Sequence, residues 1–286
     1  MTVSVMRDED LQELESFFVE YAETSMFQRS NLRAGGVVDR GDVYQGTYVG
    51  ERDAEGSLCG VAVHYWTGGV MVQAPDGPSV ALLECLREAC DRPVRALLGP
   101  FEQVVRARAV LGLEGTPCDR ASREFLYAIE LEGVEGHALL REDGVVARRA
   151  AREDLDVLAR WRVAYMSEAL WMEPSEVDVE QARGVMVRAV DERRGWVLEL
   201  RGELVAYTGN NAEVEEMHQL GGVWTPPEHR CRGYARAVIS QQLLDMRSDG
   251  RARAILFTDE ENVAAQRAYE AIGFEKIGLF GMFIGF

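Results

Sequence analysis

The sequence predicts an α/β (α+β) fold in which one arrangement of strands and helices occurs twice. Short apolar strands alternate with amphipathic helices along the whole chain, which is typical of this class. A helical segment near the N-terminus recurs 144 residues later, and the same order of elements follows it each time. A length of 286 residues is sufficient for two domains of medium size.

The repeated segment covers residues 9–21 and 153–165. The first copy reads Glu-Asp-Leu-x-x-Leu-x-x-Phe-x-Val-x-Tyr. At the positions specified here, the second copy has the same residues except for Trp in place of Phe. Apolar residues at helical spacing predict an amphipathic helix in both copies. Internal similarity at this domain-sized spacing indicates two copies of one fold.

The first half continues with runs of apolar and β-branched residues that are separated by polar turns. We expect strands where such runs are short and helices where the apolar spacing is helical. The expected strands are 44–50, 58–66, 70–73, 94–98 and a closing strand 124–131, with helices at 79–89 and 102–111.

The second half repeats this order. Its expected strands are 196–200, 204–208, 217–225, 254–258 and a terminal strand within 276–284, with helices at 234–247 and 262–272. Residues 133–144 are rich in glycine and charge, so we place the linker there. The predicted domains are therefore residues 1–134 and 145–286.

Composition excludes several classes of function. A formal net charge of −17 argues against nucleic-acid binding and favours a cationic or amine substrate, although acidic surfaces also simply maintain solubility. No apolar run reaches the ~20 residues that span a bilayer, and the acidic N-terminus lacks a secretory core. Five cysteines without paired spacing and four histidines predict neither a disulfide framework nor a metal site, so we expect a cytoplasmic protein.

The most informative stretch is Val223–Ala235, which reads Val-Trp-Thr-Pro-Pro-Glu-His-Arg-Cys-Arg-Gly-Tyr-Ala. An apolar strand ends at a Pro-Pro pair, an arginine- and glycine-rich loop follows, and a helix begins near Tyr234. Converging backbone N–H groups and the positive end of the helix dipole form a pocket for phosphate. Gly233 allows the loop to turn and the ligand to approach the backbone.

The spacing Arg230-x-x-Gly233-x-Ala235 resembles the pyrophosphate loop of the GCN5-related N-acetyltransferases (GNAT family). Downstream, Asn262-x-x-Ala-x-x-x-Tyr269-x-x-x-Gly-Phe resembles the fourth helix of that family and its following turn. Two such motifs in this order are more specific than either alone. The resemblance implies two GNAT-like domains, each with a mixed, mostly antiparallel sheet flanked by helices.

The resemblance also implies acetyl-CoA (coenzyme A) as the cofactor. Backbone groups of Val223 and Thr225 would pair with the pantetheine arm as an added strand, and the amides of the loop would wrap the pyrophosphate. Alanine at 235 replaces a second glycine that is often present in the family. The residues expected to contact the cofactor are Val223, Trp224, Thr225, Arg230, Cys231, Arg232, Gly233, Tyr234, Ala235, Arg236 and Asn262.

The first copy lacks these motifs. Residues 74–79, Ala-Pro-Asp-Gly-Pro-Ser, lead into the corresponding helix without an arginine, and Asp76 would repel phosphate. Phe101 stands where the second copy has Asn262, and Arg108 where it has Tyr269. We interpret residues 1–134 as a degenerate copy without a cofactor site; an unrelated α/β domain is the alternative.

Tyr269 is the candidate general acid. By resemblance, its phenol lies near the cofactor sulfur and protonates the leaving thiolate, since a phenol retains its proton at neutral pH. The alternative is a helix tyrosine that only packs. Asn262 has the sequence position of a helix cap and is expected to fill that role in addition to any contact with the cofactor.

The general base stays open. The position that often carries a glutamate in the family holds Gln219, which cannot act as a base. His218 points to the opposite face unless a bulge turns it inward. The remaining possibilities are water and three carboxylates that are more typical of a solvated surface: Glu173, Glu215 and Glu216.

The acceptor pocket is expected to use aromatic side chains from the first helix and the strands, although such residues more often belong to a core. The segment Trp171-Met-Glu-Pro reads as a helix end and loop, which makes Trp171 a candidate wall. The candidates are Trp161, Tyr165, Trp171, Tyr207 and Trp224.

The sequence therefore predicts an N-acetyltransferase that moves acetyl to a primary amine by direct attack in a ternary complex. The amine belongs to a small molecule or a peptide, and its identity and the oligomeric state stay open. The alternative is a non-catalytic acyl-CoA sensor, which Gln219 favours. A dinucleotide-binding domain is disfavoured because Gly-x-Gly-x-x-Gly is missing.

Overall fold

The computed structural model describes residues 1–169 and 179–286. The chain divides into two compact units. Unit 1 comprises Met1–Leu126 and Ile277–Phe286, and unit 2 comprises Tyr127–Lys276. The chain therefore passes from one unit to the other within strand β6 and returns within strand β12.

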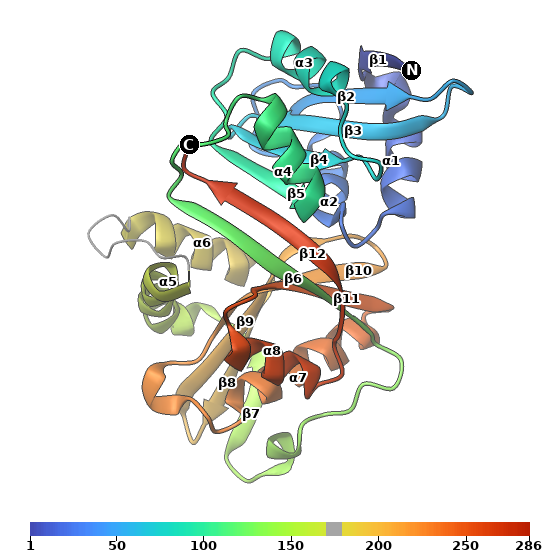
Figure 1. Cartoon of the computed structure of the whole chain (residues 1–286). Coiled ribbons are helices and arrows are strands. Elements are labelled where there is room, and N and C mark those ends of the chain that lie inside the picture. Colours follow the sequence, from blue (N-terminus) through green and yellow to red (C-terminus); the bar gives the residue numbers. More distant parts are fainter. Residues whose placement is uncertain (170–178) are drawn as a thin grey trace. The chain divides into compact units, whose positions relative to one another are not determined.

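Unit 1 is built on a mixed sheet with the order β1-β2-β3-β4-β5-β12. Neighbouring strands are antiparallel except β4 and β5, which are parallel. Figure 1 shows β12 beside β5, where Phe280 pairs with Pro100 and Ile284 with Ala96. The strands are β1 (Thr2–Val5), β2 (Gly46–Arg52), β3 (Leu58–Tyr65), β4 (Gly69–Gln73), β5 (Ala96–Pro100) and β12 (Glu275–Ile284).

Helices cover both faces of this sheet. On one face α1 (Leu11–Glu20) and α2 (Met26–Gly35) bury Phe18 and Leu32 against β2 and β3. On the other face α3 (Val80–Ala89) and α4 (Phe101–Val110) bury Leu82 and Val104 against β2 to β5. The helical spacing of these apolar residues is what allows each helix to present one face to the sheet.

Unit 2 repeats the arrangement with the order β7-β8-β9-β10-β11-β6. β7 to β10 are antiparallel neighbours, and β10 is parallel to β11. The strands are β6 (Arg120–Glu130), β7 (Val145–Arg149), β8 (Gly195–Leu200), β9 (Glu203–Glu213), β10 (Met217–Trp224) and β11 (Arg253–Asp259).

The helices of unit 2 also lie on both faces of its sheet. α5 (Leu155–Ala169) and α6 (Val179–Asp191) pack Leu158 and Met186 on one face. α7 (Tyr234–Ser248) packs Ala237 and Val238 on the other, and α8 (Val263–Glu270) follows β11. Four short 3₁₀ turns complete the described elements of the two units: η1 (Asp8–Asp10), η2 (Ala138–Arg141), η3 (Arg152–Asp154) and η5 (Pro227–His229).

The predicted fold class is confirmed, since each unit has a mixed, mostly antiparallel sheet flanked by helices. The prediction did not include β1, β7, α2 and α6 as explicit elements. It also placed the last strand of each half in its own half. In the structure β12 lies next to β5 in unit 1, and β6 lies next to β11 in unit 2.

The units therefore differ in extent from the predicted domains 1–134 and 145–286. The expected linker, residues 133–144, lies inside unit 2, and residues 277–286 belong to unit 1. Backbone hydrogen bonds decide which edge a closing strand joins, and an apolar strand pattern is the same in either place.

We expect Trp196→Phe to lower the free energy of unfolding by about 1–3 kcal/mol. Trp196 is fully buried, its Nε1 donates to Asp245 Oδ2 at 2.7 Å, and the Arg149 guanidinium lies 3.6 Å from its ring centre. Phenylalanine removes the donor and leaves the carboxylate with one partner fewer. Urea denaturation followed by circular dichroism measures the change.

Trp66→Phe is the matched control, because Trp66 is 50% exposed. We expect a change within about 0.5 kcal/mol for this variant. Equal losses in the two variants would mean that the Trp196–Asp245 hydrogen bond contributes nothing specific to stability.

Candidate functional site

The parallel pairing of β10 with β11 covers only the first half of β10. It runs from Met217 opposite Arg253 to Leu220 opposite Leu256. β10 continues to Trp224, and Gly221, Gly222 and Val223 are half-buried. The edge of β10 that faces β11 is thus available over these residues for an extended ligand.

A β-bulge interrupts the other edge of the same segment. Gly221 pairs with Gly209 and Trp224 with Tyr207, so β10 carries one residue more than β9 in between. Gly222 adopts φ 65°, a left-handed conformation that glycine takes without strain. The bulge changes the direction of the end of β10. The Trp224 ring lies edge-on to the ring of Tyr165 on α5, with 6.4 Å between the ring centres.

The loop after β10 forms a cradle of backbone N–H groups. Beyond η5, Cys231 has φ 60° and Gly233 has φ 83°, and α7 begins at Tyr234. Gly233 is the N-cap and supplies no side chain to cap the helix. Within the described residues, the first N–H groups of α7 have no hydrogen-bond acceptor, so they are free to bind an anion.

Glycine is required at position 233 for two reasons. A Cβ would lie 3.3 Å from both His137 Cε1 and Leu139 Cδ1, and the left-handed φ would strain any other residue. Burial, together with the nearby charge of Arg236, lowers the pKa of His137. The imidazole therefore adds little positive charge to the cradle at neutral pH.

The three predicted arginines of the loop differ in their surroundings. Arg230 pairs with both carboxylate oxygens of Glu168 on α5, at 2.8 and 2.9 Å, and donates to the Thr225 carbonyl at 3.0 Å. Its guanidinium also lies 5.1 Å from the Trp224 ring centre. Arg230 thus fixes the loop to α5, whereas Arg232 is exposed and Arg236 lies beside Gly233.

Tyr269 lies on α8 and is 7% exposed. Its ring centre is 6.3 Å from that of Tyr127 and 6.0 Å from that of Phe274, so the ring is held by aromatic neighbours. The Tyr127 hydroxyl donates to Glu270 Oε1 at 2.9 Å, and burial and this carboxylate raise the pKa of Tyr127 to about 12. Asn262 caps α8, with Oδ1 accepting from the Ala265 N–H at 3.1 Å.

His218 does not face the expected reaction site. Its Nδ1 lies 2.7 Å from Asn210 Nδ2, and the Asn210 oxygen accepts from Gln242 on α7. Burial, with the charges of Arg251 and Arg149, lowers the pKa of His218 to about 4. No bulge turns this residue to the other face, because the extra residue near Gln219 lies on β9.

The other positions considered in the search for a base divide into three groups. Gln219 is 2% exposed, and its Nε2 donates to the Leu220 carbonyl at 3.0 Å. Glu215 and Glu216 are exposed. Glu173 and the candidate wall residue Trp171 lie outside the described residues.

The remaining aromatic candidates lie on the α5 face of the sheet. Tyr207 is 6% exposed, and burial raises its pKa to about 12 against the opposing charges of Arg162 and Arg194. Arg162 was missed by the sequence analysis; its guanidinium lies 5.2 Å from the Tyr165 ring centre. The i, i+3 spacing of these two residues on one helix was the available signal.

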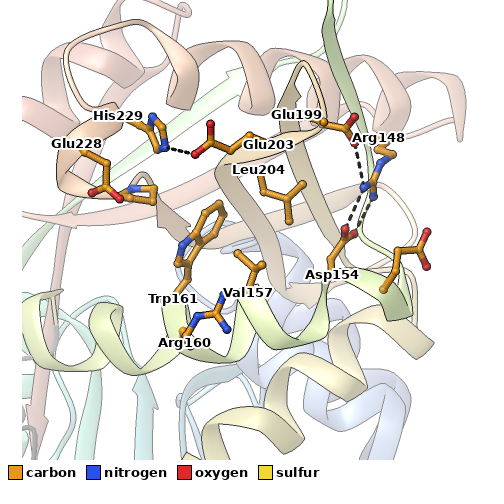
Figure 2. Close-up of a pocket in the computed structure, with 13 residues that line it drawn as sticks. Arg148, Asp154, Val157, Arg160, Trp161, Glu199, Glu203, Leu204, Glu228 and His229 are labelled. Atoms are coloured by element: carbon orange, nitrogen blue, oxygen red, sulfur yellow. Dashed lines mark hydrogen bonds and ion pairs between the residues drawn. The ribbon is translucent and has the colours of Figure 1, made fainter.

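A pocket of about 570 Å³ lies beside the loop that joins β10 to α7 and is shown in Figure 2. Trp161 and Val157 rise from α5 toward Glu203 and Leu204. Its charges are largely paired: Arg148 contacts Asp154 at 2.7 Å and Glu199 at 3.2 Å, and His229 lies 3.5 Å from Glu203. The lining residues are Arg148, Glu153, Asp154, Val157, Arg160, Trp161, Glu199, Gly202, Glu203, Leu204, Pro226, Glu228 and His229.

Comparison with known proteins agrees with this geometry. Residues 156–274 match the model of the acetyltransferase (GNAT) family. The mycothiol acetyltransferase of Thermobispora bispora is 35% identical over 68 residues, which cover 24% of this chain and 22% of that protein. The match thus spans less than a quarter of the curated relative.

Solved structures share the fold along nearly the whole chain. A Drosophila protein superposes with a TM-score of 0.70 at 14% identity, covering 99% of this chain and 98% of the other. A tandem GNAT protein from the clavulanic acid biosynthesis pathway superposes with a TM-score of 0.55 at 13% identity, covering 98% and 97%. Such low identities show the fold alone.

The part of the chain that matches the GNAT acetyltransferase family is residues 156–274, which lie within unit 2. The family match contains β10, the loop, α7 and Tyr269, so it covers the site assembled above. Among the helices that the structure describes, none combines the length and the apolar character needed to cross a membrane.

We expect acid to destabilise the protein partly through His218. Its pKa is about 4 in the folded chain against 6.5 for an ordinary histidine, so the unfolded chain binds more protons between these values. Stability is therefore lost as the pH falls from 6.5 to 4, by up to about 3 kcal/mol.

Urea denaturation of the parent protein and of His218→Gln over this pH range tests this expectation. Each protein is compared with itself at pH 7.5. Below pH 6.5, His218→Gln should lose less stability than the parent protein loses. Parallel profiles for the two proteins would mean that His218 is not the buried group that titrates.

Proposed function

We propose that unit 2 transfers an acetyl group from acetyl-CoA to a primary amine of a small molecule or peptide. The observation that carries this proposal is a series of backbone groups, at the end of β10 and at the start of α7, that have no partner within the described residues. The free edge of β10 after Leu220 leads into the left-handed turn at Cys231 and Gly233, and then into the uncapped start of α7. The family match over the same residues supports it.

The residues present fit the cofactor. Val223 and Thr225 offer backbone groups to the amides of a pantetheine arm, as an added strand does. The N–H groups from Cys231 to Arg236 fit a pyrophosphate. The positive charge of Arg230 is already paired with Glu168, so the exposed Arg232 and the neighbouring Arg236 supply the positive charge for the phosphates. When bound, acetyl-CoA supplies an activated thioester.

The chain's own groups would then orient the reaction and move protons. Tyr269 holds a phenolic proton that it donates to the leaving sulfur, and its aromatic neighbours fix the ring for this task. Gln219 cannot accept the proton of the attacking nitrogen and His218 faces α7, so the acceptor is water or one of the carboxylates Glu173, Glu215 and Glu216. The amine attacks directly while both substrates are bound.

Unit 1 has the same strand order but satisfies the equivalent backbone groups internally. Ser79 caps α3 by accepting from the Leu82 N–H at 3.0 Å, and Gln103 accepts from the Ala74 N–H at 2.7 Å. These contacts support a single cofactor site per chain.

Ala235→Asp tests the cofactor site. Ala235 is the second residue of α7, where a carboxylate interacts favourably with the helix dipole but repels phosphate. We expect acetyl-CoA to bind at least about tenfold more weakly, since a like charge in contact costs more than about 1.4 kcal/mol. Calorimetric titration measures affinity and stoichiometry, and thermal unfolding checks the fold.

The matched control is Ala81→Asp, the same change at the same position of α3 in unit 1. We expect one site per chain and unchanged affinity in this variant. Two sites in the parent protein, or a loss of affinity in Ala81→Asp alone, would contradict the assignment of the site to unit 2.

Tyr269→Phe tests the general acid. We expect the rate of acetylation to fall by about a hundredfold or more while acetyl-CoA affinity changes little, because only the phenolic proton is removed. Release of the free thiol in the presence of a panel of primary amines gives the rate.

Tyr127→Phe is the neighbouring control, since its hydroxyl donates to Glu270. Equal rates for Tyr269→Phe and the parent protein would reduce Tyr269 to a packing role. Tight binding of acetyl-CoA without turnover of any amine by the parent protein would favour a non-catalytic sensor.

A further inference from the structure

Within the described residues, hydrogen-bond donors without acceptors lie around the β10 bulge, on the α5 face of the sheet. We define the bulge site by Arg162 and Tyr165 of α5 together with Gly222 and Trp224 of β10. Arg162 reaches this site from α5: its guanidinium lies 5.2 Å from the Tyr165 ring centre, and its Nη1 is 3.9 Å from the position of a Gly222 Cβ.

Two other arginines that face α5 are paired with carboxylates. Arg183 pairs with Asp156 at 2.8 Å, and Arg230 pairs with Glu168 at 2.8 Å. The Nε of Arg162 is buried and has no hydrogen-bond partner in the described part of the chain. A buried guanidinium N–H without an acceptor in the described residues is costly, which points to a ligand that accepts a hydrogen bond there.

Trp224 gives a second, independent indication. The residue is 7% exposed, and its buried Nε1 has no partner within residues 1–169 and 179–286. Its ring stands edge-on to the same Tyr165 ring, at 6.4 Å. An indole N–H is only a donor, so this orphaned group requires an acceptor, as the guanidinium does.

The residues around this site are partly exposed. Gly222 and Val223 are half-exposed, as are Arg162 and Tyr165. The same bulged segment of β10 has its other edge free for the cofactor. A molecule at the bulge site therefore lies against the strand along which the thioester is expected to lie.

We propose that the acceptor amine carries a carboxylate, which Arg162 and the Trp224 Nε1–H bind at the β10 bulge. The simplest members of this substrate class are amino acids. A guanidinium and a planar carboxylate are complementary in shape and charge. The zwitterion carries no net charge, so the acidic surface of the chain, with a net charge of −17, does not repel it.

This inference rests on the proposed function, but its test does not depend on turnover. The probes are N-acetyl amino acids, the products of such a reaction, and their primary amides, which lack only the negative charge. Each probe is titrated calorimetrically into the full chain saturated with coenzyme A. We expect at least one N-acetyl amino acid to bind at least about tenfold more tightly than its amide.

Arg162→Gln should abolish the preference for the carboxylate, while Arg162→Lys should restore part of it. Arg160→Gln is the matched control, since Arg160 lies on the same helix and is exposed. Arg160→Gln should keep the full preference for the carboxylate over the amide. Equal binding of acid and amide by the parent protein, or a preference that survives in Arg162→Gln, would overturn the inference.

Turnover of amino acids and amino-acid amides then separates the two claims. Acetylation of amides as fast as of the acids, without a carboxylate preference in binding, leaves the acetyltransferase function and overturns the bulge site. Carboxylate-dependent binding without acetylation of any amine supports the bulge site and contradicts the proposed function.

Discussion

The site depends on one constraint, which is that every backbone N–H and C=O group needs a hydrogen-bond partner. β10 meets this requirement on its β11 edge only as far as Leu220. The N-cap of α7, Gly233, supplies no side chain to cap the helix. The backbone groups without partners at the end of β10 and at the start of α7 are close in the sequence and lie in the same unit. A ligand that resembles a strand at one end and a phosphate at the other satisfies both, which is why this segment of unit 2 is suited to a coenzyme.

Rigid neighbours keep the unpaired backbone in place. Arg230 links the loop to α5 through both oxygens of Glu168, and the same guanidinium covers Trp224. On the opposite face Gln242 connects α7 to Asn210 of β9, and Asn210 contacts His218. The loop is thus held to α5 and the following helix α7 is held to β9, so a ligand meets donors that are already oriented.

Much of this organisation is encoded locally and was predictable. The apolar periodicity predicts most of the helices and strands, and Gly233 is needed because the turn to α7 requires φ 83°. Asn262 was recognised as a cap because capping involves residues three apart. In contrast, the pairing of β12 with β5 and the proximity of Arg162 to Gly222 depend on contacts between distant residues, which no local pattern reports.

The two units show how one topology can support or exclude a site. Both sheets contain an antiparallel run followed by one parallel pair, β4 with β5 and β10 with β11. In unit 1 a serine side chain caps the helix that follows, and a glutamine accepts the N–H at the end of β4. In unit 2 glycine occupies the cap position. A hydrogen-bond partner supplied from within the chain leaves fewer backbone groups for a ligand. The cofactor site that we propose for unit 2 therefore depends on the residues at the helix start rather than on the sheet.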